Sequence, residues 1–150
     1  MDNYMKLEIA AKGENESFAR SAVAAFALPL HPTLSELSYI KTAVSEAVTN
    51  SVVHAYTREE SDRKIVIECR IVSGELHIEI TDYGCGIEDV ERAQTPFYTT
   101  LAGEERSGMG FTIMKTFMDG FYLQSAKGKG TRVAMMKRIG MDGIKDRVVA

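Results

Sequence analysis

Two polar residues one helical turn apart, Glu46 and Asn50, have the types and spacing best suited to chemistry on a phosphate. Residues four apart lie on one face of a helix, so Glu46, Asn50 and His54 would form a single polar stripe. An amide oxygen can bind a hard cation, and a carboxylate beside it can orient or deprotonate an attacking oxygen. Taken alone, the same spacing is also common on solvated helix faces.

Three Gly-x-Gly elements, at residues 84–86, 108–110 and 128–130, could bring a ligand close to the backbone. The element at 108–110 directly precedes a predicted helix, whose first amides and dipole would face an anion such as phosphate. Its spacing fits neither a Walker loop nor a Rossmann fingerprint. Any one of these elements alone is typical of a simple turn.

Asp82 is the third candidate for chemistry. It follows Leu76, Ile78 and Ile80 at alternate positions, so it would end the apolar face of a strand. A buried carboxylate costs free energy unless something bonds to it. A ligand is one possible partner, and a helix cap or a turn is the other.

Periodicity and turn signals predict the elements that must position these residues. The predicted elements are a strand at 4–10, a helix at 18–28, a long helix from 34 to 56, a hairpin at 65–82, a helix at 112–117 and a hairpin at 121–137. Thr33 and Glu36 have the spacing of a capping box, which fixes the start of the long helix. Asn15 or Ser17 can cap the helix before it.

Composition sets the broad class of protein. A length of 150 residues, with 45% hydrophobic and 26% charged residues, is typical of one globular domain. We assign it to residues 1–140 and expect 141–150 to be a loose tail. The net charge of −3 argues against non-specific nucleic-acid binding, and we find neither a membrane span nor a signal peptide. Cys69 and Cys85 lack metal or redox spacing, so we expect reduced thiols in a cytoplasmic protein.

The order of the motifs resembles a known ATP-binding fold. Glu-x-x-x-Asn, Asp-x-Gly-x-Gly, Gly-x-Gly before a helix and Gly-Thr in a late hairpin follow one another within residues 33–137. This series resembles the GHKL, or Bergerat, fold shared by gyrase, heat-shock-90 chaperones, MutL-type repair proteins and histidine kinases. The resemblance implies an α+β protein, a two-layer sandwich whose mixed, mostly antiparallel sheet is covered on one face by helices.

Three longer segments, at residues 14–20, 45–50 and 105–114, resemble the anti-sigma-F factors of endospore-forming bacteria. The resemblance implies an anti-sigma factor that inhibits a sporulation sigma factor of RNA polymerase. It also implies an ATP- and Mg²⁺-dependent protein serine/threonine kinase that phosphorylates an anti-anti-sigma protein. A homodimer is implied, with no direct nucleic-acid or membrane partner. The general-stress anti-sigma kinase is the nearest alternative.

The resemblance further implies roles for single residues. Glu46 would be the catalytic base, and Asn50 would hold Mg²⁺ between the phosphates. Asp82 would accept a hydrogen bond from the adenine amino group, with Thr131 nearby. The other nucleotide-binding residues implied are His54, Gly84, Gly86, Thr99, Thr100, Arg106, Gly108, Met109 and Gly110. The partner-binding residues implied are Arg20 and Arg106.

Several alternatives stay open at this point. His54 could be a plain helix-face residue and Met109 could be core filler. The family commonly has a lysine after the threonine pair, where this chain has Leu101. The site could also belong to an ATP-gated binding module without catalysis, or to an ATPase in which Glu46 activates water. A detached histidine-kinase catalytic domain would need a phosphoacceptor helix, which we do not find before residue 33.

Overall fold

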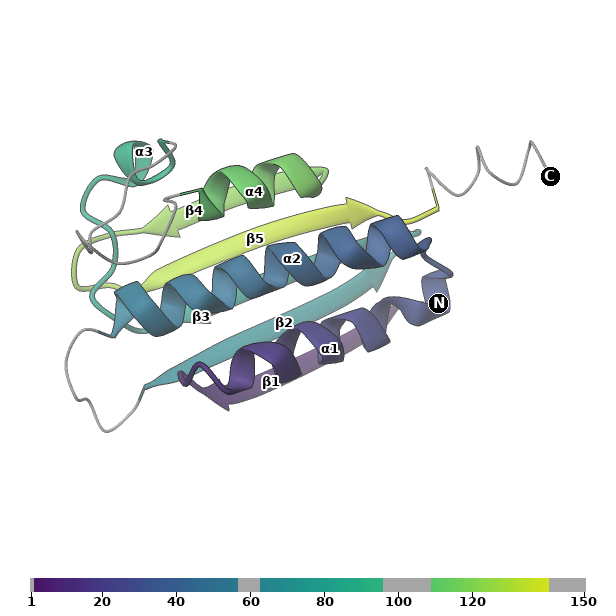
Figure 1. Cartoon of the computed structure of the whole chain (residues 1–150), viewed down its shortest axis with the longest axis horizontal. Coiled ribbons are helices and arrows are strands. Elements are labelled where there is room, and N and C mark those ends of the chain that lie inside the picture. Colours follow the sequence, from purple (N-terminus) through teal and green to yellow (C-terminus); the bar gives the residue numbers. More distant parts are fainter. Residues whose placement is uncertain (1, 57–62, 96–108, 141–150) are drawn as a thin grey trace.

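The computed structural model describes residues 2–56, 63–95 and 109–140, whose elements are labelled in Figure 1. In chain order the elements are β1 (Asn3–Ala10), α1 (Asn15–Ala27), η1 (Leu28–Leu30), α2 (Leu34–Asn50), η2 (Ser51–Ala55), β2 (Lys64–Val72), β3 (Glu75–Asp82), α3 (Val90–Ala93), α4 (Gly110–Phe117), β4 (Gly120–Ser125) and β5 (Thr131–Arg138). Within these ranges the structure has no helix that is long and apolar enough to cross a membrane.

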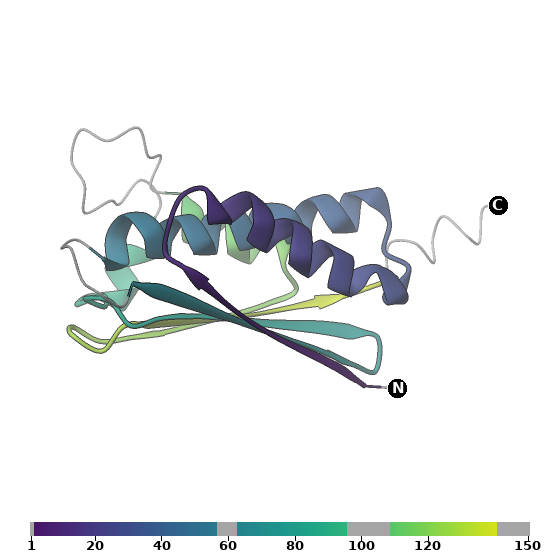
Figure 2. The ribbon, with the colours of Figure 1, turned by 90° about the horizontal axis from the view of Figure 1, so that it is seen from below.

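The strands form one five-stranded sheet in the order β1-β2-β3-β5-β4, and each neighbouring pair is antiparallel. The helices lie on one face of this sheet, as the edge-on view in Figure 2 shows. On that face α2 packs between α1 and α4. The structure confirms the predicted α+β fold, a two-layer sandwich with a mostly antiparallel sheet.

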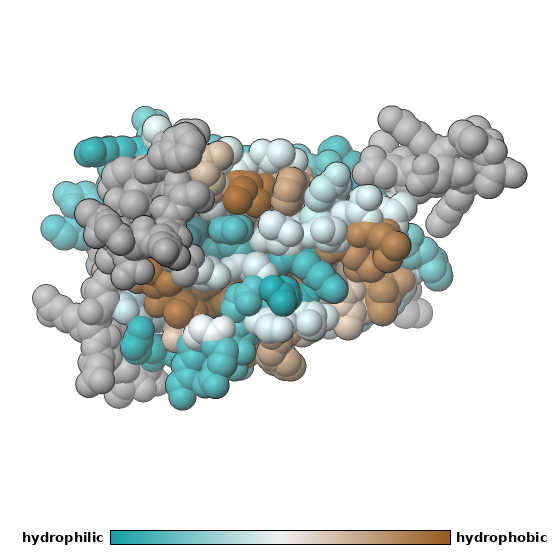
Figure 3. Space-filling view, viewed as in Figure 1, coloured by the Kyte–Doolittle hydropathy of each residue, from teal (hydrophilic) through white to brown (hydrophobic). Residues whose placement is uncertain are grey.

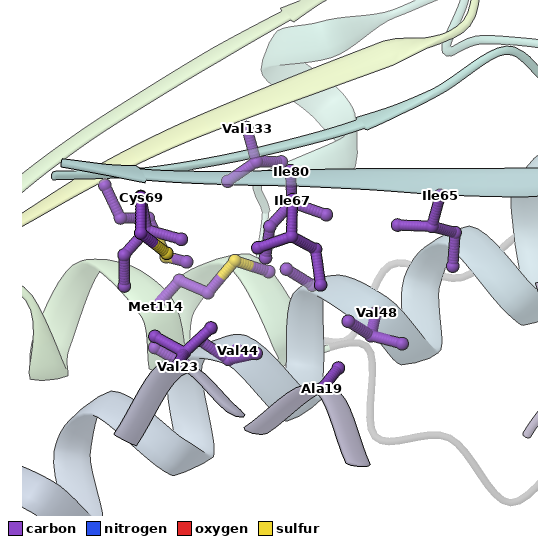
Figure 4. Packing of buried hydrophobic residues seen from close by; sticks show 14 of the residues in the cluster. Ala19, Val23, Val44, Val48, Ile65, Ile67, Cys69, Ile80, Met114 and Val133 are labelled. Carbon is purple, nitrogen blue, oxygen red and sulfur yellow. The ribbon is translucent and has the colours of Figure 1, made fainter. Parts of the chain in front are cut away.

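Alternation along the strands places apolar side chains under the helices. Ile65, Ile67 and Cys69 of β2 point from the sheet toward α1 and α2 (Figure 4). Val23, Val44 and Val48 face them from these helices, with Val48 opposite Ile65 (Figure 4). The opposite face of the sheet carries ion pairs between neighbouring strands, including Lys6 with Glu68 and Arg132 with Glu79. The period-2 pattern therefore separates a buried face from a charged one.

The predicted capping box starts α2. The Glu36 backbone N–H donates to Thr33 Oγ1 at 3.0 Å, and the Thr33 N–H donates to Glu36 Oε1 at 2.9 Å. Glu36 is fully buried, and its other oxygen accepts the Gly140 N–H at 2.9 Å. One carboxylate therefore joins the start of α2 to the turn that follows β5.

The predicted cap of α1 is wrong. Neither Asn15 nor Ser17 caps it: the helix begins at Asn15, and its N-cap residue Glu14 makes no side-chain cap bond. Glu14 already has helical backbone angles, whereas a capping side chain needs an extended residue at that position. The Asn15 side chain instead donates to the Ala10 carbonyl at 2.9 Å, which ties the start of α1 to the end of β1.

The long helix also departs from the prediction of one continuous helix to residue 56. The α-helix ends at Asn50, and Ser51–Ala55 form a π-helical turn. A π turn bonds i to i+5, so it changes the spacing that would put His54 directly in line with Asn50. Smaller differences are that α4 begins at Gly110 rather than at residue 112, and that the short helix α3 was not predicted.

Candidate functional site

The predicted site elements meet at one end of the molecule. The C-terminal end of α2, the end of β3, the start of α4 and the start of β5 lie together at the left of Figure 1. Residues far apart in the sequence therefore gather where two helix ends and two strand ends converge. The individual contacts show which side chains face each other there.

Glu46 and Asn50 of α2 lie against the first residue of α4, Gly110. A Cβ atom built on Gly110 would lie 3.1 Å from Asn50 Nδ2 and 3.3 Å from Glu46 Oε2. The missing side chain thus leaves the acid and the amide next to the first turn of α4. The first N–H groups of a helix have no intrahelical acceptor and carry a partial positive charge, which suits an anion. The structure brings these three predicted residues together.

Asp82 is buried, with 3% of its surface exposed, and is surrounded by hydrogen-bond donors. The Ser51 hydroxyl donates to Oδ2 at 2.9 Å, and the Gly84 N–H donates to Oδ1 at 3.1 Å. Thr131 faces Asp82 across β3 and β5, and its backbone N–H is close enough to influence the pKa of the carboxyl. Burial raises the pKa of the Asp82 carboxyl; the Gly84 N–H, the Ser51 hydroxyl and the Thr131 N–H oppose that rise without cancelling it.

Ser51 was missed by the sequence analysis. It follows Ala47 by four positions and precedes Ala55 by four, and all three residues are buried. This stripe of small residues is the signal that could have predicted a buried Ser51, packed against the sheet, rather than a solvent-exposed one. The stripe also lets the end of the helix approach the loop after Asp82 closely.

Glycines shape that loop. A Cβ atom on Gly84 would overlap the Ala55 carbonyl, and one on Gly86, where φ is +73°, would overlap the Ala126 carbonyl. The Cys85 N–H donates to the Ala55 carbonyl at 2.8 Å, which fixes the loop against the end of η2. Gly84 and Gly86 are therefore required by close backbone approach, as well as being predicted ligand neighbours.

A second serine joins the remaining parts of the site. The Ser125 hydroxyl accepts the Ile87 N–H at 2.8 Å and lies 2.8 Å from the Gly130 carbonyl and 2.9 Å from Thr131 Oγ1. It connects the loop after β3 with the β4–β5 turn and so holds predicted residue Thr131 in place. Nothing in the sequence pattern singles out Ser125, because these partners are tertiary.

The other predicted residues fall into three groups. His54 lies in the π turn, where its carbonyl accepts the Cys85 Sγ–H at 3.2 Å, and Met109 is the N-cap residue of α4. Arg20 lies on α1, where it pairs with Glu16 at 3.1 Å and lines a hollow with Leu34 and other α2 residues. The predicted residues that lie outside the described ranges are Thr99, Thr100, Arg106 and Gly108.

The described residues contain no cluster of three His, Cys, Asp or Glu side chains that could hold a metal ion. The polar side chains at Gly110 offer one carboxylate and one amide. Such a pair fits an oxygen-liganded cation such as Mg²⁺, which takes one or two protein ligands and completes its shell with water and phosphate oxygens. The site fits a metal carried by a nucleotide better than a metal bound by protein alone.

Fold and site together define the class. The chain belongs to the family of histidine kinase-like ATPase domains, which it matches over residues 9–137. It is 55% identical over 140 residues to the anti-sigma F factor of Clostridium botulinum (strain Eklund 17B / Type B), covering 93% of this chain and 97% of that one. It is 53% identical over 139 residues to the anti-sigma F factor of Caldanaerobacter subterraneus subsp. tengcongensis, covering 93% and 96%. These similarities confirm the predicted family.

Solved structures show the same fold in more distant proteins. The RsbU and RsbW domains of Rv1364c from Mycobacterium tuberculosis match with a TM-score of 0.66 and 16% identity, over 91% of this chain and 32% of that one. The mycobacterial sensor histidine kinase MprB matches with a TM-score of 0.52 and 17% identity, over 90% and 97%. At these identities the similarity concerns the fold alone.

Proposed function

We propose that this protein is an anti-sigma factor that binds ATP and phosphorylates a serine on an anti-anti-sigma partner. The observation that carries the proposal is the placement of Glu46 and Asn50 against the first residue of α4. A helix start beside a carboxylate and an amide suits a polyphosphate and its cation. The similarity to anti-sigma F factors over 93% of the chain supports the same function.

Asp82 would recognise the base of the nucleotide. Its carboxylate accepts hydrogen bonds from the Ser51 hydroxyl and the Gly84 N–H, which oppose the rise in pKa that burial causes. An ionised carboxylate only accepts hydrogen bonds, so it suits the amino group of adenine and repels the carbonyl oxygen of guanine. The glycine loop at Gly84 and Gly86 allows a planar base to approach the backbone.

The chain's own residues would then prepare the transfer. Asn50 would hold Mg²⁺ through its amide oxygen, and Mg²⁺-ATP, when bound, supplies the γ-phosphoryl group. Glu46 would accept the proton of a serine hydroxyl on the docked partner, a contribution of roughly 10²–10⁴ in rate. The rest of the catalysis would be positioning and charge stabilisation around the phosphates.

Inhibition of the sigma factor would use a separate protein-binding surface. Arg20 lies on the outer side of the helical layer, in a hollow that also contains Lys41 and Leu37. Figure 3 shows hydrophobic surface at the end of this layer, where α1 ends and α2 begins, and Leu34 there is 86% exposed. A sigma subunit could contact both features. A homodimer could form through β1, whose outer edge pairs with no described strand.

Glu46→Gln tests the kinase assignment. We expect this variant to bind Mg²⁺-ATP as the wild type does, because the amide keeps the shape of the carboxylate. It should lose phosphate transfer to the anti-anti-sigma partner, measured with γ-labelled ATP. Retained transfer would remove Glu46 from the role of base. Steady ATP turnover without any partner would favour an ATPase, and binding without transfer by the wild type would favour a non-catalytic module.

The sigma partner can be identified separately. A pull-down with Mg²⁺-ATP should recover a sporulation sigma subunit of RNA polymerase. Recovery of a general-stress sigma subunit instead would favour the general-stress kinase. Recovery of no sigma subunit would contradict the anti-sigma function and leave the phosphate-transfer assay to decide the enzymatic part.

A further inference from the structure

The buried hydroxyl of Ser51 is a polar group of the site that the proposed mechanism does not use. Ser51 has 5% of its surface exposed, and its hydroxyl donates to Asp82 Oδ2 at 2.9 Å. It follows Asn50 directly in the chain. The same backbone turn therefore holds the amide at the phosphate end of the site and a donor at the base end.

The hydrogen bonds of Asp82 explain why this donor matters. An ionised carboxylate offers about four acceptor positions. Backbone N–H groups of Gly84 and Thr131 use some of them, and the Ser51 hydroxyl uses another on Oδ2. Ser51 is the one side-chain donor among these three, and it comes from the helical layer rather than from the sheet. It therefore sets which part of the carboxylate is left for a ligand.

We propose that Ser51 is a positioning residue that determines base specificity: it orients the Asp82 carboxylate to accept a hydrogen bond from the 6-amino group of a purine. This inference rests on the proposed nucleotide-binding function. It adds a link between the two layers, because Ser51 ties the recognition of the base to the turn that also carries Asn50.

The test compares ATP with ITP, which differ in the group at position 6 of the purine. Wild-type protein should prefer ATP, because ITP presents a carbonyl oxygen to the carboxylate. Ser51→Ala should weaken ATP binding about tenfold, because the Asp82 carboxylate loses the bond that orients it and its charge-assisted hydrogen bond to the 6-amino group becomes weaker. ITP binding should change little, so the ratio of the two dissociation constants should narrow about tenfold. Ser51→Thr, which keeps the hydroxyl, should restore much of the preference.

Ser45→Ala is the matched control. The Ser45 hydroxyl is also buried in α2, but it bonds to no atom of the described residues. This variant should keep the wild-type ratio of dissociation constants. Thermal unfolding of each variant should give a cooperative transition, which checks that the variant is folded.

Two results would overturn the inference. One is an unchanged ratio in Ser51→Ala, and the other is an equal weakening of ATP and ITP, which would indicate a purely structural role. The proposed function fails separately if the wild type does not prefer ATP or if Asp82→Asn binds ATP normally, and the inference then fails with it.

Discussion

At the scale of single residues, the site rests on a carboxylate that is expensive to bury. Asp82 is 3% exposed, and its pKa is raised by burial even though three donors contact it. A carboxylate in such a place lowers the stability of the fold. Its presence is therefore better explained by a role in binding than by a role in stability. A folded-state cost at one residue is typical of functional sites, where perturbed pKa values cluster.

The raised pKa makes a prediction about stability and pH. Because the folded protein favours protonated Asp82, this residue stabilises the fold below the ordinary aspartate pKa of about 3.9. That contribution is lost as the pH rises through the raised pKa. The stability of Asp82→Asn relative to the wild type should therefore increase as the pH rises above about 4, as measured by urea unfolding. A wild type that gains on the variant as the pH rises would contradict the account.

At the scale of elements, the first residue of α4 shows how the choice of residue serves the site rather than the helix. Gly110 is the first residue of this helix, and its nearest side chains are those of Asn50 and Glu46. Glycine is a poor helix former, which costs roughly 0.5–1 kcal/mol relative to alanine. Its presence here is explained by the room it leaves in the site rather than by helix stability.

Gly110→Ala separates these two effects. The helix should be as stable as before or more stable, because alanine favours it. The new methyl group would push on Asn50 and Glu46, so Mg²⁺-ATP binding should weaken about tenfold, a value based on roughly 1.4 kcal/mol of lost contacts. Thermal unfolding and titration calorimetry measure the two changes. Gly13→Ala is the control: no described atom lies near its added methyl, so it should change neither the unfolding temperature nor the affinity for ATP. ATP binding by Gly110→Ala with wild-type affinity would contradict the placement of Gly110 beside the phosphates.

The capping box of α2 carries a prediction about stability alone. Thr33→Ala should lower the free energy of unfolding by about 1 kcal/mol. Glu36→Ala should lower it by about 2–4 kcal/mol, because the Thr33 and Gly140 N–H groups both lose their acceptor. Urea unfolding measures both values. Ser35→Ala, at an exposed position in the same turn, is the control, and a Glu36→Ala variant as stable as this control would contradict the described contacts.

Features that depend on residues close together in the chain could be predicted from the sequence. The capping box at Thr33 and the hairpin that ends in Asp82 follow from spacing and alternation, and both are present. The π turn after α2 and the uncapped start of α1 could not be predicted, because tertiary packing decides how these helices begin and end. The contacts of Ser51 and Ser125 join residues from different elements, so no pattern within one element could predict them.

At the scale of the whole molecule, the helical layer and the sheet contribute different residues to the site. The helical layer covers one face of the sheet and supplies Glu46, Asn50 and Ser51, and the sheet supplies Asp82. The other face of the sheet is covered by charged side chains in cross-strand ion pairs, such as Lys64 with Glu8. The site therefore lies between the layers, at the end where helices and strands finish together.

The central claim is that Glu46, Asn50 and Asp82 face one bound nucleotide. Titration calorimetry with Mg²⁺-ATP on the wild type, Asp82→Asn and Glu46→Gln tests it most directly. We predict that the wild type and Glu46→Gln bind ATP with similar affinity, and that Asp82→Asn loses at least tenfold while remaining folded. ATP binding by Asp82→Asn with wild-type affinity would show that the buried carboxylate does not contact the nucleotide, and would contradict the account.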